Sequence, residues 1–155
     1  MRFSGTTGSS YTSDISVDDI GVSDGGICSS SIAVFPATDG FESGLSNWQQ
    51  DTDDDFNWTT RTGSTPSSNT GPTSAAQGST YLYTEASSPN HPNKSARISS
   101  PCYNLNDLSN PELKFSYHMW GATMATLDIQ VSTNGGLTWQ SGLFTLSGDQ
   151  GNQWN

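Results

Sequence analysis

The sequence predicts an all-β domain of short strands joined by polar turns. Helical periodicity is hard to find, whereas short segments of alternating apolar and polar residues recur along the whole chain. These segments are bounded by turn-forming residues, and the chain contains 16 Gly and 7 Pro. The 5 Trp, 5 Tyr and 6 Phe can anchor a folded core although only 31% of the residues are hydrophobic.

The length and the net charge of the chain limit which functions can be expected. A chain of 155 residues is long enough for one domain with a core and too short for two ordinary ones. Its formal net charge of -10 repels phosphate backbones and anionic lipids, so nucleic acid is not an expected partner. No apolar run approaches the roughly 18–20 residues of a membrane-spanning helix, so membrane insertion is not expected. The first residues lack the apolar region of a signal peptide, and we expect any secretion signal to lie outside this chain.

The C-terminal half contains the clearest strand patterns. Glu112–Met119 and Thr126–Ser132 alternate apolar and polar residues, which is typical of strands with one buried face. Asn134–Gly136 is then a strong turn signal, and Leu137–Trp139 and Leu143–Leu146 supply further strand material. We therefore expect two strands, a tight turn and two more short strands.

The same turn has a second signature. Ser132–Trp139 resembles the Ser-x-Asp-x-Gly-x-x-Trp hairpin of sialidase-like proteins, the Asp-box, with Asn134 in place of the aspartate. That hairpin is structural in those proteins. The resemblance therefore implies a turn architecture and no glycosidase chemistry.

Further strand signals lie upstream. Tyr81–Glu85, Ala96–Ser99 and Asn57–Thr62 have the composition of strands. Thr62–Ser79 is rich in Gly, Ser, Thr and Pro and nearly free of apolar residues, so it is predicted to be a long surface loop. A loop of this length is either functional or solvated filler, and both alternatives stay open.

In the N-terminal strand pattern, the alternation of apolar and polar residues shifts part of the way along, which we call a slip. Within Asp14–Val22 the apolar residues keep one alternation up to Asp18-Asp19 and a shifted one after it. This slip predicts a β-bulge, which would turn one of the two carboxylates towards the edge of the sandwich. Ser23–Ser31 is rich in Gly and Ser and resembles a linker.

Several short segments, none of which identifies a family by itself, occur in a specific order along the chain. They are, in chain order, Phe41–Leu45, Trp48, Asp53–Trp58, Ser67–Pro72, Tyr81–Ala86, Ala96–Ile98, Phe115–Gly121 and Leu127–Val131. This order resembles the MAM domain, the meprin/A5/receptor phosphatase mu module, from about Phe35 to the C-terminus. The resemblance implies a jelly-roll β-sandwich of the concanavalin A-like type in an extracellular adhesion protein.

The resemblance also implies an unusual arrangement of the chain. Family members end in a strand with an acidic pair, and Ser13–Ile20 is similar to that strand although it precedes the domain. We therefore expect a tandem-repeat fragment: 1–24 would be the C-terminal strand region of a preceding repeat, 25–34 a linker, and 35–155 a MAM-like domain truncated before its last strands. Because a jelly roll brings its first and last strands together, the N-terminal strand could close this domain as a circular permutant. Exchange of that strand between two chains is the competing arrangement.

Cys28 and Cys102 are the only cysteines, which excludes a cysteine metal cluster. Two buried thiols and one disulfide both fit this count. The Ser-, Thr- and Asn-rich, Lys-poor composition favours an oxidising, extracellular compartment and hence a Cys28–Cys102 disulfide. MAM domains often carry four cysteines, and the placement of Cys102 resembles bacterial members, so we expect a bacterial secreted or surface protein.

The motif content does not support catalysis. His91 lies in a polar loop among prolines and asparagines, and His118 is expected on the outward face of its strand. The sequence contains no nucleophile elbow, no phosphate-binding glycine loop and no zinc-protease motif. The chain is therefore predicted to be non-catalytic.

An acidic cluster is the candidate for ion binding. Four aspartates lie within Asp51–Asp55, where like charges repel unless a cation or solvent compensates them. The spacing does not match an EF-hand, so a solvated acidic loop is an alternative. The family resemblance implies a structural calcium ion held by Glu42, by Asp54 or Asp55, and by Asp19 if the N-terminal strand closes the domain.

The tryptophans raise the question of sugar binding. Trp48, Trp58 and Trp139 are expected in the core, and Trp120 is the candidate for ligand contact because it lies at a strand end. The first predicted function is a non-catalytic extracellular adhesion or protein-interaction module whose partners are proteins or neighbouring repeats. The alternative is a carbohydrate-binding accessory module of a secreted hydrolase or protease, with glycans as ligands.

Overall fold

The computed structural model describes residues 1–22 and 31–155, which form twelve β-strands. Within these two ranges there is no α-helix, and so no helix with the length and apolarity of a membrane crossing. The strands are β1 (Arg2–Thr6), β2 (Ile15–Val22), β3 (Ser31–Ile32), β4 (Ala37–Asp39), β5 (Gln49–Gln50), β6 (Thr59–Thr62), β7 (Thr80–Tyr83), β8 (Ser95–Ser99), β9 (Cys102–Tyr103), β10 (Leu113–Met119), β11 (Thr126–Val131) and β12 (Gln140–Ser147).

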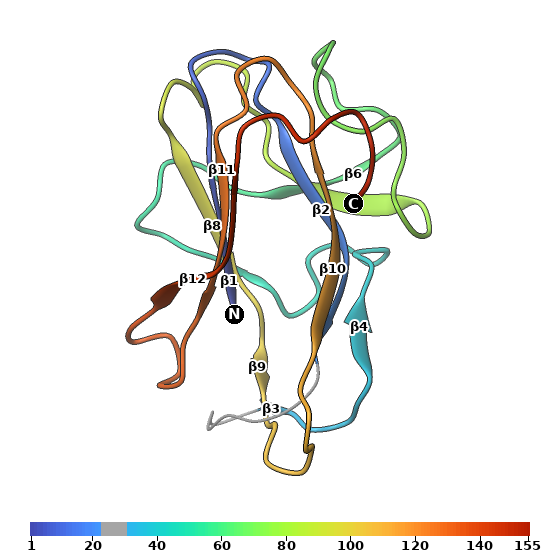
Figure 1. Ribbon diagram of the computed structural model, residues 1–155, viewed down its shortest axis with the longest axis vertical. Coiled ribbons are helices and arrows are strands. Elements are labelled where there is room, and N and C mark those ends of the chain that lie inside the picture. Colours follow the sequence, from blue (N-terminus) through green and yellow to red (C-terminus); the bar gives the residue numbers. More distant parts are fainter. Residues whose placement is uncertain (23–30) are drawn as a thin grey trace.

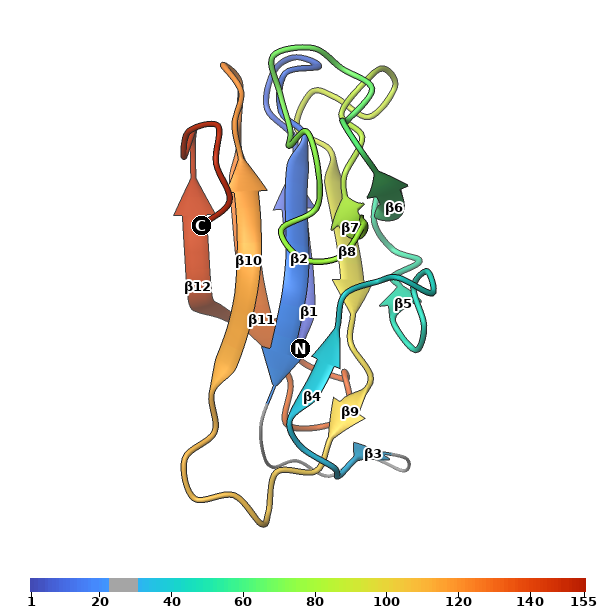
Figure 2. The same cartoon turned by 90° about the vertical axis from the view of Figure 1, so that its right-hand side faces the viewer.

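Two sheets pack face to face as a sandwich, as Figure 1 and Figure 2 show from two sides. The first sheet has the strand order β12-β11-β1-β8-β5, and the second has the order β10-β2-β7-β6 with β4 also paired to β2. The short strands β3 and β9 form a separate parallel pair at one end. The predicted all-β jelly-roll sandwich is confirmed.

The N-terminal residues supply a central strand of each sheet. β1 lies between β11 and β8, and β2 lies between β10 and β7. Phe3, Ile15 and Val17 on these strands are fully buried because they point from central positions into the space between the sheets. The N-terminal strands thus close the sandwich within the same chain, in the way the permuted closure predicts, and exchange of these strands between two chains stays a prediction.

β2 contains the predicted β-bulge. Asp18 lies opposite Ser116 of β10 and Gly21 lies opposite Lys114, so two residues of β2 face one residue of β10. Asp19 has a positive φ of 50°, a backbone conformation that accommodates the extra residue. The bulge leaves Asp18 buried and Asp19 exposed.

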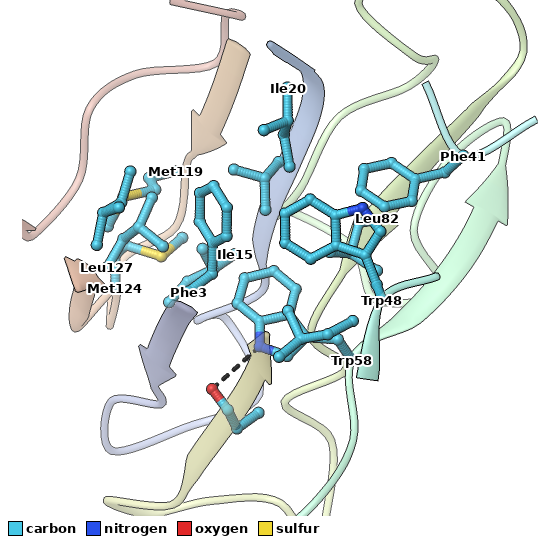
Figure 3. Close-up of a cluster of buried hydrophobic side chains, with 14 residues drawn as sticks. Phe3, Ile15, Ile20, Phe41, Trp48, Trp58, Leu82, Met119, Met124 and Leu127 are labelled. Carbon is cyan, nitrogen blue, oxygen red and sulfur yellow. Dashed lines mark hydrogen bonds between the residues drawn. The ribbon is translucent and has the colours of Figure 1, made fainter. Parts of the chain in front are cut away.

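The core between the sheets is rich in aromatic side chains (Figure 3). The Phe3 and Trp48 rings lie 5.7 Å apart. Trp58 Nε1 donates a hydrogen bond to the Ala96 carbonyl at 3.0 Å, and Trp48 Nε1 donates one to the Asp39 carboxylate at 3.1 Å. The prediction that Trp48 and Trp58 belong to the core is confirmed, and both indole N–H groups are satisfied.

The Asp-box-like hairpin is a structural turn held by its own side chains. Asn134 Oδ1 accepts the Thr138 backbone N–H at 2.9 Å, and Ser132 Oγ accepts the Gly136 N–H at 2.8 Å. Because these bonds keep the backbone in the turn, the predicted strand at Leu137–Trp139 is wrong. A single strand, β12, begins after it.

Two predictions concern the segment after β2. Part of the predicted linker at 25–34 is strand β3, and Ser31 lies opposite Cys102 of β9. Cys28, shortly before Ser31 in the chain, lies outside the described residues. The Cys28–Cys102 disulfide therefore stays a prediction, as does the assignment of 1–24 to a preceding repeat.

Candidate functional site

The negative charge of the acidic loop at 51–55 is partly balanced by protein cations that are distant in the sequence. Arg2 Nη1 of β1 contacts the Asp51 carboxylate at 3.0 Å, and Arg97 Nε of β8 contacts the same carboxylate at 3.6 Å. Arg97 Nη2 also contacts Asp53 Oδ1 at 2.8 Å. The repulsion expected within the loop is thus relieved by arginines that the strand pairing brings beside it.

The remaining aspartates of the loop bind the beginning of β8. The Arg97 backbone N–H donates to Asp54, and the Ser95 backbone N–H donates to Asp55 at 2.8 Å. Lys94 Nζ contacts Asp55 at 2.8 Å, and this hydrogen bond lowers the pKa of Asp55. Burial raises the pKa of Asp54. These bonds attach the loop to the edge of the first sheet.

The four residues predicted to hold calcium have separate surroundings. Glu42 accepts the backbone N–H groups of Ser79 and Thr80, both at 2.9 Å, and the Ser79 hydroxyl at 2.6 Å. The Ser79 hydroxyl bond is the main reason that the pKa of Glu42 is lowered. Asp54 and Asp55 bind β8, and Asp19 lies at the bulge of β2. Among the described residues no group of three or more His, Cys, Asp or Glu side chains could hold a metal ion, so the calcium site stays a prediction.

A polar groove of about 1110 Å³ runs beside the acidic loop. Its lining includes Asp51 from the loop, Gln50 of β5, Arg2 of β1 and the hairpin residues Asn134 and Trp139. The sheet order explains this convergence, since β5 and β1 flank β8 and the hairpin follows β11. The fold therefore builds one concave surface from segments far apart in the sequence.

Arg2 organises the floor of this groove. Its guanidinium carbon lies 4.5 Å from the centre of the Trp139 ring, a cation–π arrangement. Its Nε donates to Gln130 Oε1 at 2.8 Å, while Nη1 pairs with Asp51. Trp139 is half-buried in the groove wall, so the prediction that it belongs to the core is wrong. Its position depends on Arg2, which comes from the other end of the chain.

The side chains that line the groove can bind a ligand through hydrogen bonds and one apolar contact. Amide, hydroxyl and carboxylate side chains line it, and the apolar side chain of Leu137 on the hairpin is 85% exposed at its rim. Neither histidine is among the lining residues. The lining therefore contains no Ser–His or Cys–His pair, although the Ser99 hydroxyl donates a hydrogen bond to Asp51 Oδ1 at 3.0 Å.

His118 lies on the outward face of β10 as predicted, but it is buried rather than exposed to solvent. It points away from the core, yet it is only 2% exposed because the C-terminal residues cover it. Its Nε2 lies 3.2 Å from Asn152 Oδ1, and its ring lies 5.5 Å from the Trp154 ring. Burial lowers the pKa of His118. The sequence could not show this cover because residues 149–155 carry no strand pattern.

Asp14 is a buried carboxyl group that sequence reasoning missed. Its Oδ1 accepts the Ala86 N–H at 2.8 Å, and its Oδ2 has no partner within the described chain. Burial raises its pKa to about 7, against the effect of the Ala86 bond. The signal that could have found it is the alternation of β2, which places Asp14, Ser16 and Asp18 on one face.

Ser16, His118 and Asp14 do not form a catalytic triad. Ser16 lies directly opposite His118 on the neighbouring strand. Their side-chain atoms Ser16 Oγ and His118 Nδ1 nevertheless have no hydrogen-bond partner in the described chain. All three residues are buried, so a substrate could not reach the hydroxyl.

Trp120, the predicted ligand contact, does not line the groove. It is half-buried, and its carbonyl accepts the Gly71 N–H at 3.3 Å. A role of Trp120 in ligand binding stays a prediction.

The sequence of the domain matches known proteins. The profile of the MAM domain, meprin/A5/mu, matches residues 40–155. MAM domain-containing glycosylphosphatidylinositol anchor protein 2 of Mus musculus is 32% identical over an alignment of 132 residues that covers 75% of this chain and 14% of that protein. The corresponding anchor protein 1 of Gallus gallus is 32% identical over 112 residues, 68% of this chain and 12% of that protein. Neuropilin-1 of Xenopus laevis is 33% identical over 116 residues, 74% of this chain and 12% of that protein.

The source organisms and the lengths of the relatives are informative. These relatives are animal proteins, so the expected bacterial source is not supported. The chain spans only about an eighth of the length of these relatives, at 12–14%. No solved structure matches the chain.

Proposed function

Because the chain belongs to the MAM domain family, we propose that it is a non-catalytic extracellular adhesion or protein-interaction module of a secreted or cell-surface multidomain protein. Two relatives are named as glycosylphosphatidylinositol anchor proteins, a type of attachment found at the outer cell surface, and the third is named neuropilin. None of these names describes an enzyme. The acidic net charge of -10 also favours a partner other than nucleic acid.

The observation that carries this proposal is the open groove beside the acidic loop. It combines an exposed apolar anchor, Leu137, with hydrogen-bonding side chains such as Gln50 and Asn134. Protein interfaces pair an apolar contact with a polar rim in this way. The ion pairs of Arg2 and Asp51 hold the groove floor in place before a partner binds, which reduces the ordering cost of association.

A carbohydrate-binding accessory module is the second candidate. The observation that favours it is the half-buried ring of Trp139 among amide and carboxylate groups, since sugars stack on such rings and hydrogen bond to such groups. The Arg2 guanidinium already lies over one face of this ring, which leaves less of it for a sugar. The groove is therefore better suited to binding a protein than to binding a sugar.

A protein array and a glycan array distinguish the two candidate functions. The chain is applied to an array of purified extracellular protein domains that includes the chain itself, and to a glycan array. We expect binding to at least one protein domain and none to glycans, and we expect Leu137→Asp to weaken protein binding at least tenfold. Leu143→Asp, on the outer face of β12, is the matched control because Leu143 is exposed and lies outside the groove lining. Glycan binding without protein binding would replace the first proposal by the second.

Finer features of the predicted protein belong to the same proposal. Neighbouring repeats are proposed as partners of this module, supported by the similarity of Ser13–Ile20 to the last strand of the family. A Cys28–Cys102 disulfide is proposed, supported by the pairing of Ser31 with Cys102. A calcium ion at Glu42, Asp54, Asp55 and Asp19 rests on the family resemblance alone.

A further inference from the structure

Two segments of the chain match the acceptor pattern for N-linked glycans, which is Asn-x-Ser or Asn-x-Thr with x other than proline. They are Asn57–Thr59, with the sequence Asn-Trp-Thr, and Asn93–Ser95, with the sequence Asn-Lys-Ser. So short a pattern also occurs by chance. The surroundings of each asparagine therefore decide whether a glycan fits there.

The fold presents the first acceptor segment to solvent. Trp58 in its middle is only 1% exposed because its side chain packs in the core. Its neighbours Asn57 and Thr59 point the other way, as alternate residues of an extended segment do, and both are exposed. The side-chain amide of Asn57 has no hydrogen-bond partner within residues 1–22 and 31–155. A sugar on this amide would therefore replace no contact of the fold.

The second acceptor segment lies beside the first. Asn93 is exposed, and its side-chain amide also lacks a hydrogen-bond partner in the described part of the chain. The two residues that follow it both bind Asp55: Lys94 Nζ contacts the carboxylate at 2.8 Å, and the Ser95 N–H donates to it at 2.8 Å. Because Asp55 comes two residues before Asn57, both asparagines lie near this one contact.

Asn57 also lies between two edge strands. It is in the connection from β5 to β6, and each of these is the last strand of its sheet. Figure 2 shows β5 and β6 on the same side of the molecule. The backbone groups of an edge strand can pair with another chain, so proteins cover or interrupt such edges. A bulky, solvated glycan at Asn57 would cover this side.

The groove lies at the other end of β8 from both acceptor segments. Gln49 is paired with Ser99 at the end of β8, and Asp55 binds Ser95 at its beginning. Gln49 and Ser99 line the groove, whereas no residue of the two acceptor segments does. Glycans on these segments would therefore leave the groove open.

The asparagines of the groove do not match the acceptor pattern. Asn47 and Asn134 both line it, and the residues two positions later are Gln49 and Gly136, which have no hydroxyl group. The segment Asn47–Gln49 otherwise resembles Asn57–Thr59, with an exposed asparagine, a buried tryptophan and an exposed third residue. Only the third residue separates the groove segment from an acceptor.

We propose that Asn57 and Asn93 carry N-linked glycans, which cover the β5–β6 side of the sandwich and leave the groove open. The proposal rests on the extracellular function proposed above, because these glycans are added in the secretory pathway. The asparagine Nδ2 forms a bond to the anomeric carbon of the first sugar of a lipid pyrophosphate-linked oligosaccharide. The bond from that carbon to the pyrophosphate oxygen breaks, the lipid pyrophosphate leaves, and the amide loses one proton.

Secretion of the chain from cultured animal cells, behind an added signal peptide, provides the test. We expect the mass of the secreted protein to show two glycans. Asn57→Gln and Asn93→Asp should each remove one, and aspartate at 93 suits the positive φ of 55° there. Enzymatic release of the glycans in heavy-oxygen water converts each occupied asparagine to a labelled aspartate, which peptide mass spectrometry locates. Absence of a glycan from Asn57 or from Asn93 would overturn the proposal.

Gln49→Thr is the matched control, since it places the sequence Asn-Trp-Thr in the groove wall. It should add a third glycan, at Asn47, and weaken at least tenfold the same protein binding that Leu137→Asp weakens. Enzymatic removal of the glycans from the unaltered protein should change that binding less than twofold. A larger change would contradict the placement of the glycans away from the groove. Two glycans without binding to any protein domain would refute the function of the groove and support the acceptor sites.

Discussion

The N-terminal strands and the β10–β12 side of the sandwich differ in how completely their strands are paired and their side chains buried. β1 and β2 have a partner on both sides and bury Phe3, Ile15 and Val17 completely. β10 and β12 each have an outer edge, and their facing side chains are only half-buried. The difference teaches that residues 1–22, which lie ahead of the matched region at 40–155, carry the centre of the fold, whereas β10 and β12 near the end of the matched region carry a less completely covered side.

The largest effect is expected from removing residues 1–22. Without β1 and β2, the neighbouring strands β11, β8, β10 and β7 lose their ladders at the middle of each sheet. We expect the shortened chain to lose its cooperative unfolding transition, measured by circular dichroism during heating.

Complementation is the control for this deletion. A peptide of residues 1–22, added in excess, should restore a cooperative transition because the closure then occurs between two molecules instead of within one. A cooperative transition of the shortened chain alone would show that the matched region folds without its central strands.

Phe3→Ala compares the two regions at a single side chain. Phe3 is fully buried on β1, so its truncation leaves a cavity and should lower the free energy of unfolding by about 3–5 kcal/mol. Leu143→Ala on β12, where the side chain is 57% exposed, should change it by less than about 0.5 kcal/mol. Urea unfolding measures both. Similar losses in the two variants would contradict the comparison.

The burial of Asp14, just before β2, predicts that the stability of the fold depends on pH. Burial raises its pKa from 3.8 to about 7, so between these pH values the folded state keeps a proton that the unfolded state releases. Stability therefore falls as pH rises through this window and levels off above about pH 7. Asp14→Asn cannot ionise, and it should remove up to about 4 kcal/mol of that decline in urea unfolding series.

The low-pH end of the series is the internal control for Asp14→Asn. Near pH 2.5, well below the unfolded-state pKa of 3.8, the carboxyl group is almost fully protonated in both states, so the contribution of its ionisation is negligible and the two proteins should be closest in stability. A remaining decline in the variant is expected from Asp18, whose pKa burial also raises. Equal slopes in the two proteins would exclude Asp14 as the source.

Calcium is expected to have the smallest effect. If Glu42 and its predicted partners hold the ion, millimolar calcium raises the melting temperature by roughly 2–4 °C for each kcal/mol of binding, and Glu42→Ala removes this rise. Glu112→Ala is the matched control, because Glu112 is an exposed glutamate outside the predicted set. An unchanged melting curve after chelation would remove the calcium site.

Much of the fold was predictable because strand patterns are local. Alternation identified β2, β10 and β11, and its slip located the bulge at Asp18-Asp19. Strands as short as β5, or as polar as Arg2–Thr6 of β1, carry too few apolar residues for alternation to be read. β1 is buried because of its neighbours in the sheet, which its own residues do not reveal.

The candidate site was less predictable than the fold. The acidic run drew attention to Asp51–Asp55, but its cations, Arg2 and Arg97, are remote in the sequence. Trp139 was expected in the core, but it lies in the groove wall beside Arg2. His118 alternates outward as expected, yet the Trp154 segment covers it.

The sequence by itself determined an all-β domain, its MAM-like order of segments, its bulge and its structural hairpin, because each depends on residues that are neighbours in the chain. Only the tertiary structure decided that β1 and β2 close the sandwich, that arginines from β1 and β8 pair with the acidic loop, and that β10 and β12 are the outer strands of their sheets. The reason is physical: burial, ion pairing and edge exposure depend on which strands become neighbours, and those neighbours lie far apart in the chain.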